Sequence, residues 1–144
     1  MNPSNRTLGS LLTAAALFCA PLAACKKHAT MDVPVYPGSS QASSFPNVEG
    51  DTGTLFHLYR QTPDRMGTVA TFYRKDLVDQ RGWTEQKGFG ISFTDGNMKV
   101  ESPGQGTSSK GTVVDPSRPG GHVFIFESGD ATYVEIWQHI PKPE

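Results

Sequence analysis

Cysteine is scarce in this chain and confined to its beginning. Only Cys19 and Cys25 occur among the 144 residues. Residues 26–144 contain no thiol, which excludes a disulfide framework and a thiolate metal site in that part of the chain. The two cysteines lie in one apolar segment and its end, so we do not expect them to form a bridge with each other.

Acidic residues are absent before Asp32, and no apolar run is long enough to cross a bilayer. The run Leu8–Ala20 is almost wholly apolar and follows the single basic residue Arg6. A transmembrane helix needs about 20 apolar residues. A short basic segment, a shorter apolar run and small residues before a cleavage point are typical of a secretory signal. We therefore predict that residues 1–24 are a signal peptide.

The chain also lacks an excess of either charge. Its formal net charge is −1 at pH 7. Nucleic-acid-binding domains carry basic patches that neutralise phosphates, and this balance offers no such excess. We therefore expect no nucleic-acid partner.

The segment that ends the apolar run is Leu22-Ala23-Ala24-Cys25. It resembles the lipobox of bacterial lipoproteins, in which small residues fit the signal peptidase and the cysteine thiol receives a diacylglyceryl group. The resemblance implies cleavage between Ala24 and Cys25 and a covalent lipid, including palmitate, on Cys25. An ordinary secretory signal with a chance cysteine is the alternative.

The same resemblance implies a location for the mature protein. A single acyl chain binds a membrane only marginally, whereas two or three on one residue give lasting attachment. Lys26 stands directly after Cys25. An aspartate at this position would resemble the inner-membrane retention signal of Gram-negative lipoproteins, and the lysine does not match that signal. We expect a lipid-anchored protein on the outer membrane, facing the periplasm, with the outer leaflet of the inner membrane as the alternative.

The remainder of the chain is predicted to form a short tether, residues 25–32, and a single domain, residues 33–144. The clearest helix signal in this domain starts at Thr62 and Pro63, a favourable N-cap and first helical residue. An apolar stripe at helical spacing follows, and Gly82 is a stop signal. The stripe consists of Met66, Val69, Ala70, Tyr73 and Leu77.

Alternating apolar residues predict strands on both sides of this helix. The Gly-, Ser- and Pro-rich residues 102–121 are expected to form a long mobile or functional connection. An apolar helix stripe must cover a sheet face, so we predict an α+β fold of two layers, with one long helix packed on an antiparallel sheet of about four to five strands. The predicted strands are residues 54–60, 89–93, 98–100, 122–127 and 132–139.

A second resemblance covers residues 33–84. Tyr36-Pro37-Gly38, Phe72-Tyr73-Arg74 and Gly82-Trp83 resemble a pattern found in small, largely uncharacterised bacterial envelope lipoproteins. The resemblance implies a fold and no activity, and structural roles explain its members: Tyr73 as a core residue and Gly82 as a helix stop.

Motifs for catalysis and metal binding are missing. The sequence contains neither a zinc-binding HExxH helix nor a GxSxG elbow. His57 and His139 lie on predicted strands that could bring them together, with Glu135 nearby, although solvated or half-buried histidines are the simpler interpretation. We expect no enzymatic activity, no metal and no cofactor other than the lipid on Cys25.

Aromatic residues are the remaining candidates for a functional surface. Tyr133 and Trp137 share one face of the last predicted strand and would form an interaction surface if that face were exposed. We therefore hypothesise a non-enzymatic accessory or adaptor that binds another envelope protein. The alternatives are a tethered module that binds peptidoglycan, a glycan or a small apolar molecule and, third, a hydrolase that uses a histidine and a carboxylate.

Replacing the predicted lipidated residue tests the anchor. Cys25→Ser removes the thiol that would carry the lipid, so we expect the uncleaved precursor to accumulate without palmitate. Metabolic labelling with palmitate and the mass of the isolated protein measure both effects. An unchanged mass together with full membrane retention in Cys25→Ser cells would contradict the lipobox interpretation.

Overall fold

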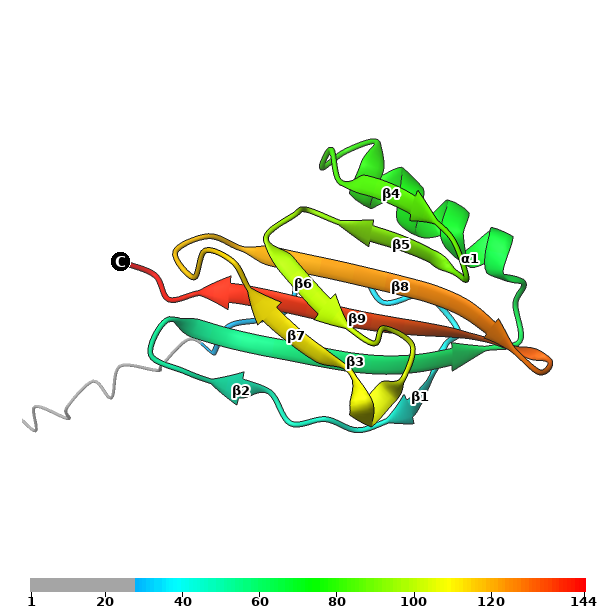
Figure 1. Cartoon of the computed structure of the whole chain (residues 1–144), viewed down its shortest axis with the longest axis horizontal. Coiled ribbons are helices and arrows are strands. Elements are labelled where there is room, and N and C mark those ends of the chain that lie inside the picture. Colours follow the sequence, from blue (N-terminus) through cyan, green and yellow to red (C-terminus); the bar gives the residue numbers. More distant parts are fainter. Residues whose placement is uncertain (1–27) are drawn as a thin grey trace, which may run out of the picture.

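The computed structural model describes residues 28–144, and an antiparallel sheet of seven strands is its central layer (Figure 1). The strands lie in the order β1-β3-β9-β8-β5-β4, and β2 pairs with β3 beside β1. A separate hairpin of β6 and β7 crosses over β8, β9 and β3. The predicted signal peptide, residues 1–24, and the predicted lipid site Cys25 lie outside the described residues.

The helices and strands have these bounds along the chain. The strands are β1 (Ser40–Ser43), β2 (Val48–Glu49), β3 (Gly53–Thr62), β4 (Thr84–Lys87), β5 (Ile91–Thr94), β6 (Met98–Glu101), β7 (Lys110–Val113), β8 (Gly120–Ser128) and β9 (Ala131–Pro141). The helix α1 (Met66–Tyr73) continues as a π-helical turn (Arg74–Val78), and a 3₁₀ turn (Gly106–Ser108) joins β6 to β7.

The two faces of the central sheet are covered by different elements. Side chains alternate between faces along a strand, so β8 sends Val123 and Ile125 towards the helix, where they form one core with Leu77. The opposite face of β9 carries Trp137, and the backbone of Gly111 in β7 packs directly on the indole ring. The domain therefore has three layers: helix, sheet and hairpin.

The helix starts later than its sequence signals indicate. Thr62 is the last residue of β3, paired with Thr132 of β9, and its hydroxyl accepts the backbone N–H of Asp64 at 3.2 Å. The first helical N–H, that of Met66, is instead bound by the carboxylate of Glu127 at 3.0 Å. A negative side chain at a helix N-terminus is favoured by the helix dipole, and here it comes from the end of β8.

The predicted α+β fold with one long helix on a small sheet is wrong. The described chain is mostly β, and its helix has eight α-helical residues followed by five π-helical ones. The sheet is larger than expected because polar segments join it: Ser40–Ser43 and Val48–Glu49 pair with β3. Lys110–Val113, inside the expected connection 102–121, pairs with β6. These segments have no apolar alternation, and backbone hydrogen bonds to neighbouring strands place them.

The domain makes contacts with residues that the sequence assigned to the tether. The backbone N–H groups of Asp32 and Val33 donate to the side-chain oxygen of Gln138, at 2.9 and 3.1 Å. The His28 ring lies 3.3 Å from Glu49. The chain is thus held against the domain from its first described residues onward. No helix within residues 28–144 is long and apolar enough to cross a membrane.

Two glycine-to-alanine substitutions test the layer formed by the hairpin. A Cβ at Gly111 would lie 2.4 Å from Cε3 of Trp137, whereas a Cβ at Gly67 in α1 meets nothing within 4 Å. We expect Gly111→Ala to lower the free energy of unfolding by about 1–3 kcal/mol through overpacking. Gly67→Ala should raise it by roughly 0.5 kcal/mol, because alanine favours a helix. Urea unfolding measures both, and equal effects of the two substitutions would mean that β7 does not pack on Trp137.

Candidate functional site

Three long strands place chemically interesting side chains on the face opposite the helix. The register sets His57 beside Trp137 and Trp137 beside His122 in one row across β3, β9 and β8. In the next row, Glu135 lies between Tyr59 and Phe124. Histidine, tryptophan and carboxylate side chains are thereby brought together from strands that are distant in sequence.

Glu135 is the centre of a buried polar group that we call the Glu135 cluster: His57, Gly104, Glu135 and Trp137. The Glu135 side chain is 0% exposed. Its Oε1 lies 2.8 Å from Nε2 of His57 and accepts the indole N–H of Trp137 at 3.3 Å. Its Oε2 accepts the backbone N–H of Gly104. The His57 ring is sandwiched between the rings of Trp137 and Phe45, with centroids 3.8 and 4.0 Å away.

The donors around Glu135 keep it ionised despite its burial. Burial alone raises the pKa of a carboxyl group, but hydrogen bonds from His57 and from the backbone of Gly104 outweigh this effect and lower the pKa of Glu135. Gly104 belongs to the segment between β6 and β7. The cluster therefore ties this segment to the sheet through a buried negative charge.

The hollow beside His57 is small. It has a volume of about 90 Å³ and is lined by side chains of β1 and β3 together with Phe45. A histidine oriented by a carboxylate is the geometry of a general base. In this cluster the carboxylate of Glu135 is buried, and both of its oxygens already accept hydrogen bonds from His57, Trp137 and the backbone of Gly104. These bonds connect parts of the fold.

The other histidines of this face are buried separately. His57 and His139 lie on the same face but not opposite each other, since Trp137 pairs with His57 and Leu55 pairs with His139. Nδ1 of His122 and Nε2 of His139 are buried and have no hydrogen-bond partner among the described residues. Within residues 28–144, no group of three His, Cys, Asp or Glu side chains is arranged to hold a metal ion.

Four aromatic rings form a stacked row at the far end of the same face, and we call it the aromatic strip: Tyr59, Phe89, Phe126 and Tyr133. Neighbouring ring centroids are 5.6 Å apart for Tyr59–Tyr133, 5.3 Å for Tyr133–Phe126 and 6.3 Å for Phe126–Phe89. Phe89 is 87% exposed, whereas Phe126 is 7% exposed. The strip thus runs from a nearly covered centre to a fully exposed ring.

The two residues expected to form an interaction surface, Tyr133 and Trp137, differ in their exposure. Tyr133 is half-buried and belongs to the aromatic strip. Trp137 is 7% exposed beneath β7, so the condition of an exposed face is not met at this residue. The strand expected at residues 89–93 begins only at Ile91, so Phe89 lies outside it. Phe89 lies in the turn before β5, between Gly88 and Gly90, and an aromatic residue flanked by glycines is the signal that could have revealed it.

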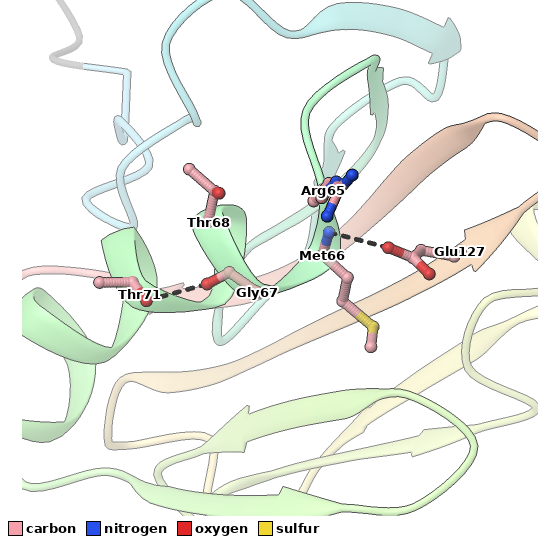
Figure 2. A pocket seen from close by; sticks show the side chains of 6 residues that line it. All are labelled: Arg65, Met66, Gly67, Thr68, Thr71 and Glu127. Carbon is pink, nitrogen blue, oxygen red and sulfur yellow. Dashed lines mark hydrogen bonds between the residues drawn. The ribbon is translucent and has the colours of Figure 1, made fainter.

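Larger hollows than the one beside His57 lie elsewhere on the described chain. One, of about 600 Å³, opens at the start of α1 between Arg65 and Thr71 (Figure 2). Figure 2 shows the carboxylate of Glu127 already bound to the N–H of Met66 there. The helix–sheet interface is filled, because Tyr73 and Phe93 are both 0% exposed. The helix–sheet interface therefore leaves no ligand pocket beside Tyr73 or Phe93.

Comparisons of the chain with protein-family models, with curated proteins and with solved structures find no match.

The buried His122 predicts a pH dependence of stability. Burial lowers the pKa of His122 from 6.5 to about 4. Between these two pH values the ring is neutral in the folded chain and protonated in the unfolded chain. The free energy of unfolding should therefore decrease as the pH falls from 6.5 to 4. The shift corresponds to a loss of about 3 kcal/mol at about 1.4 kcal/mol per pH unit.

Urea unfolding between pH 7 and 5 measures the first part of this loss, roughly 2 kcal/mol. This window lies above the range in which carboxylates such as Glu135 bind protons. His122→Gln should flatten the dependence. His28→Gln is the matched control, because the His28 side chain is 80% exposed. A slope that survives in His122→Gln would assign the pH dependence to other groups.

Proposed function

We propose that this chain is the precursor of a bacterial envelope lipoprotein, anchored through Cys25, whose domain is a non-enzymatic adaptor. The adaptor binds another envelope protein through the aromatic strip. The observation that carries the proposal is the exposure of Phe89, 87%, at the end of a row of stacked rings. A large apolar ring that leaves water on binding is the kind of anchor that dominates interface energies.

The surroundings of the strip suit a neutral partner. Gln61 lies opposite Tyr133, and Gln86 and Ser92 continue the row of Phe124 on the outer strands. The charged member of these rows on this face is Glu135, which is fully buried. Interfaces are depleted of charge at their centre and enriched in tyrosine and phenylalanine, and the strip has this composition.

The position of the strip suits a protein held on a membrane. The first described residue, His28, lies against Glu49, which pairs with Thr54 near the start of β3. Tyr133 pairs with Gln61, near the other end of the same strand. At about 3.3 Å per residue the two positions are roughly 20 Å apart. Figure 1 shows the described chain beginning at the opposite end of the long strands from the β8–β9 turn, so a partner would approach from the side away from the bilayer.

The alternative functions have less support. A small apolar molecule would require a cavity beside Tyr73 or Phe93, and both side chains are completely packed. A hydrolase would require His57 to reach a substrate, but His57 is sandwiched between two rings and bound to the enclosed Glu135. A glycan remains the main alternative occupant of the strip, because sugars also stack on aromatic rings.

Crosslinking in intact cells, followed by purification of a tagged chain, tests the adaptor function. We expect one envelope protein to be captured in stoichiometric amount by the wild type. The double variant Phe89→Ala, Tyr133→Ala should reduce capture at least tenfold, about the effect of losing 1.4 kcal/mol or more of binding energy. Val48→Ala and Val114→Ala are matched controls, since both valines are exposed and lie outside the strip.

The outcome also separates the alternatives. Capture that survives in the double variant would overturn the strip as the docking surface. Cell-wall fragments in place of a protein, lost with the double variant, would shift the function to a tethered glycan-binding module.

A further inference from the structure

The segment between β6 and β7 lies over part of the aromatic face. We call residues 102–109 the strap. A Cβ at Gly104 would lie 2.8 Å from a ring carbon of Phe124 and 3.0 Å from one of Phe126. A Cβ at Gly106 would lie 3.6 Å from a ring carbon of Tyr59, an ordinary contact distance. The strap backbone therefore covers Phe124 and Phe126, each only 7% exposed, next to the exposed end of the strip.

The strap is bound mainly through its backbone at Gly104. The N–H of this residue donates to Glu135, and its carbonyl accepts the hydroxyl of Tyr59 at 3.2 Å. Inside the strap, the hydroxyl of Ser109 donates to the carbonyl of Ser102 at 2.8 Å. Ser102 itself has φ 53°, a left-handed conformation and the only one at a non-glycine residue among the residues described. A segment held this way stores backbone strain that its release would relieve.

We infer that the strap is an intramolecular stand-in for a partner's peptide, and that an extended, glycine-containing segment of the partner displaces it from the aromatic face. The inference rests on the proposed adaptor function. It extends the docking surface from the exposed end of the strip to the covered rings of Phe126, within the strip, and of Phe124 beside it.

The chemistry of the covered surface selects this occupant. Glu135 is buried and ionised, and a buried carboxylate that loses a donor is strongly destabilised. Displacement of the strap therefore costs least when another N–H replaces that of Gly104 at Glu135. Gly104 is recognised by one N–H, one carbonyl and the absence of a side chain between two rings. An extended peptide with a glycine at the corresponding position meets these three requirements.

Hydrogen exchange of the strap tests how it is held, with the full chain purified in detergent. Tyr59→Phe removes the hydroxyl that binds Gly104 and keeps the ring, so amide exchange in residues 102–109 should become about fivefold faster, the effect of one lost hydrogen bond. Tyr133→Phe is the matched control, because its ring belongs to the strip but its hydroxyl makes no bond to the strap among the described residues. Equal exchange in both variants would overturn the role of Gly104 as the attachment point.

Lifting the strap tests the competition with a partner. Gly104→Ala forces a Cβ against two rings, whereas Gly106→Ala adds one in ordinary contact, and both glycines have positive φ, 80° and 60°. We expect Gly104→Ala to bind several-fold more of an apolar fluorescent dye and to capture several-fold more partner in the crosslinking experiment. Gly106→Ala should leave both close to wild type.

Three results would overturn the inference. Dye binding that is equal in the two alanine variants would mean that the covered rings stay covered. Increased dye binding with decreased capture of the partner would make the strap part of the docking surface and not its competitor. Increased dye binding with no protein captured by any form of the chain would refute the adaptor function, and the peptide occupant with it, while leaving the strap movable.

Discussion

The antiparallel pairing of β3, β9 and β8 is the constraint on which the other features of this domain depend. These strands pair along their lengths, and the period of two along a strand assigns every side chain to one face. A slip of one residue would exchange the two faces completely. It would bring Val134 and Ile136 under the hairpin and place Glu135 in the core beneath the helix. The correct register thus defines the helix-side core and the aromatic face together.

A buried ionised carboxylate is the costly element within this frame. Removing a charge from water is unfavourable, and an ion pair in the interior often stabilises a fold less than apolar residues would. Glu135 is compensated by His57, by Trp137 and by the backbone of Gly104. Because Gly104 belongs to the strap, the same compensation determines where residues 102–109 lie. The charge therefore contributes to the position of a segment more than to the stability of the whole domain.

The proposed functions follow from the asymmetry of the two sheet faces. The helix face is closed by apolar packing around Tyr73 and Leu77. The opposite face is covered by a hairpin and a backbone-bound strap, and its aromatic row continues to the exposed Phe89. A surface of this kind can lose part of its cover without disrupting the core. That property connects the adaptor proposal with the strap inference.

Patterns of neighbouring residues predict the elements whose signals are local. The apolar stripe of the helix and the long strands at 54–60, 122–127 and 132–139 correspond to described elements, since periodicity depends on neighbouring residues. The lipobox interpretation of Leu22-Ala23-Ala24-Cys25 has the same local basis and stays a prediction.

Contacts between distant segments set the size of the sheet and the composition of the candidate site. Ser40–Ser43 and Lys110–Val113 become strands because β3 and β6 offer them hydrogen bonds. The carboxylate of Glu127, at the end of β8, binds the first N–H group of the helix. Trp137 is buried and Phe89 exposed because β7 covers one ring and a turn presents the other. Each outcome depends on contacts between segments that are distant in sequence. A local pattern of residues carries no information about such contacts.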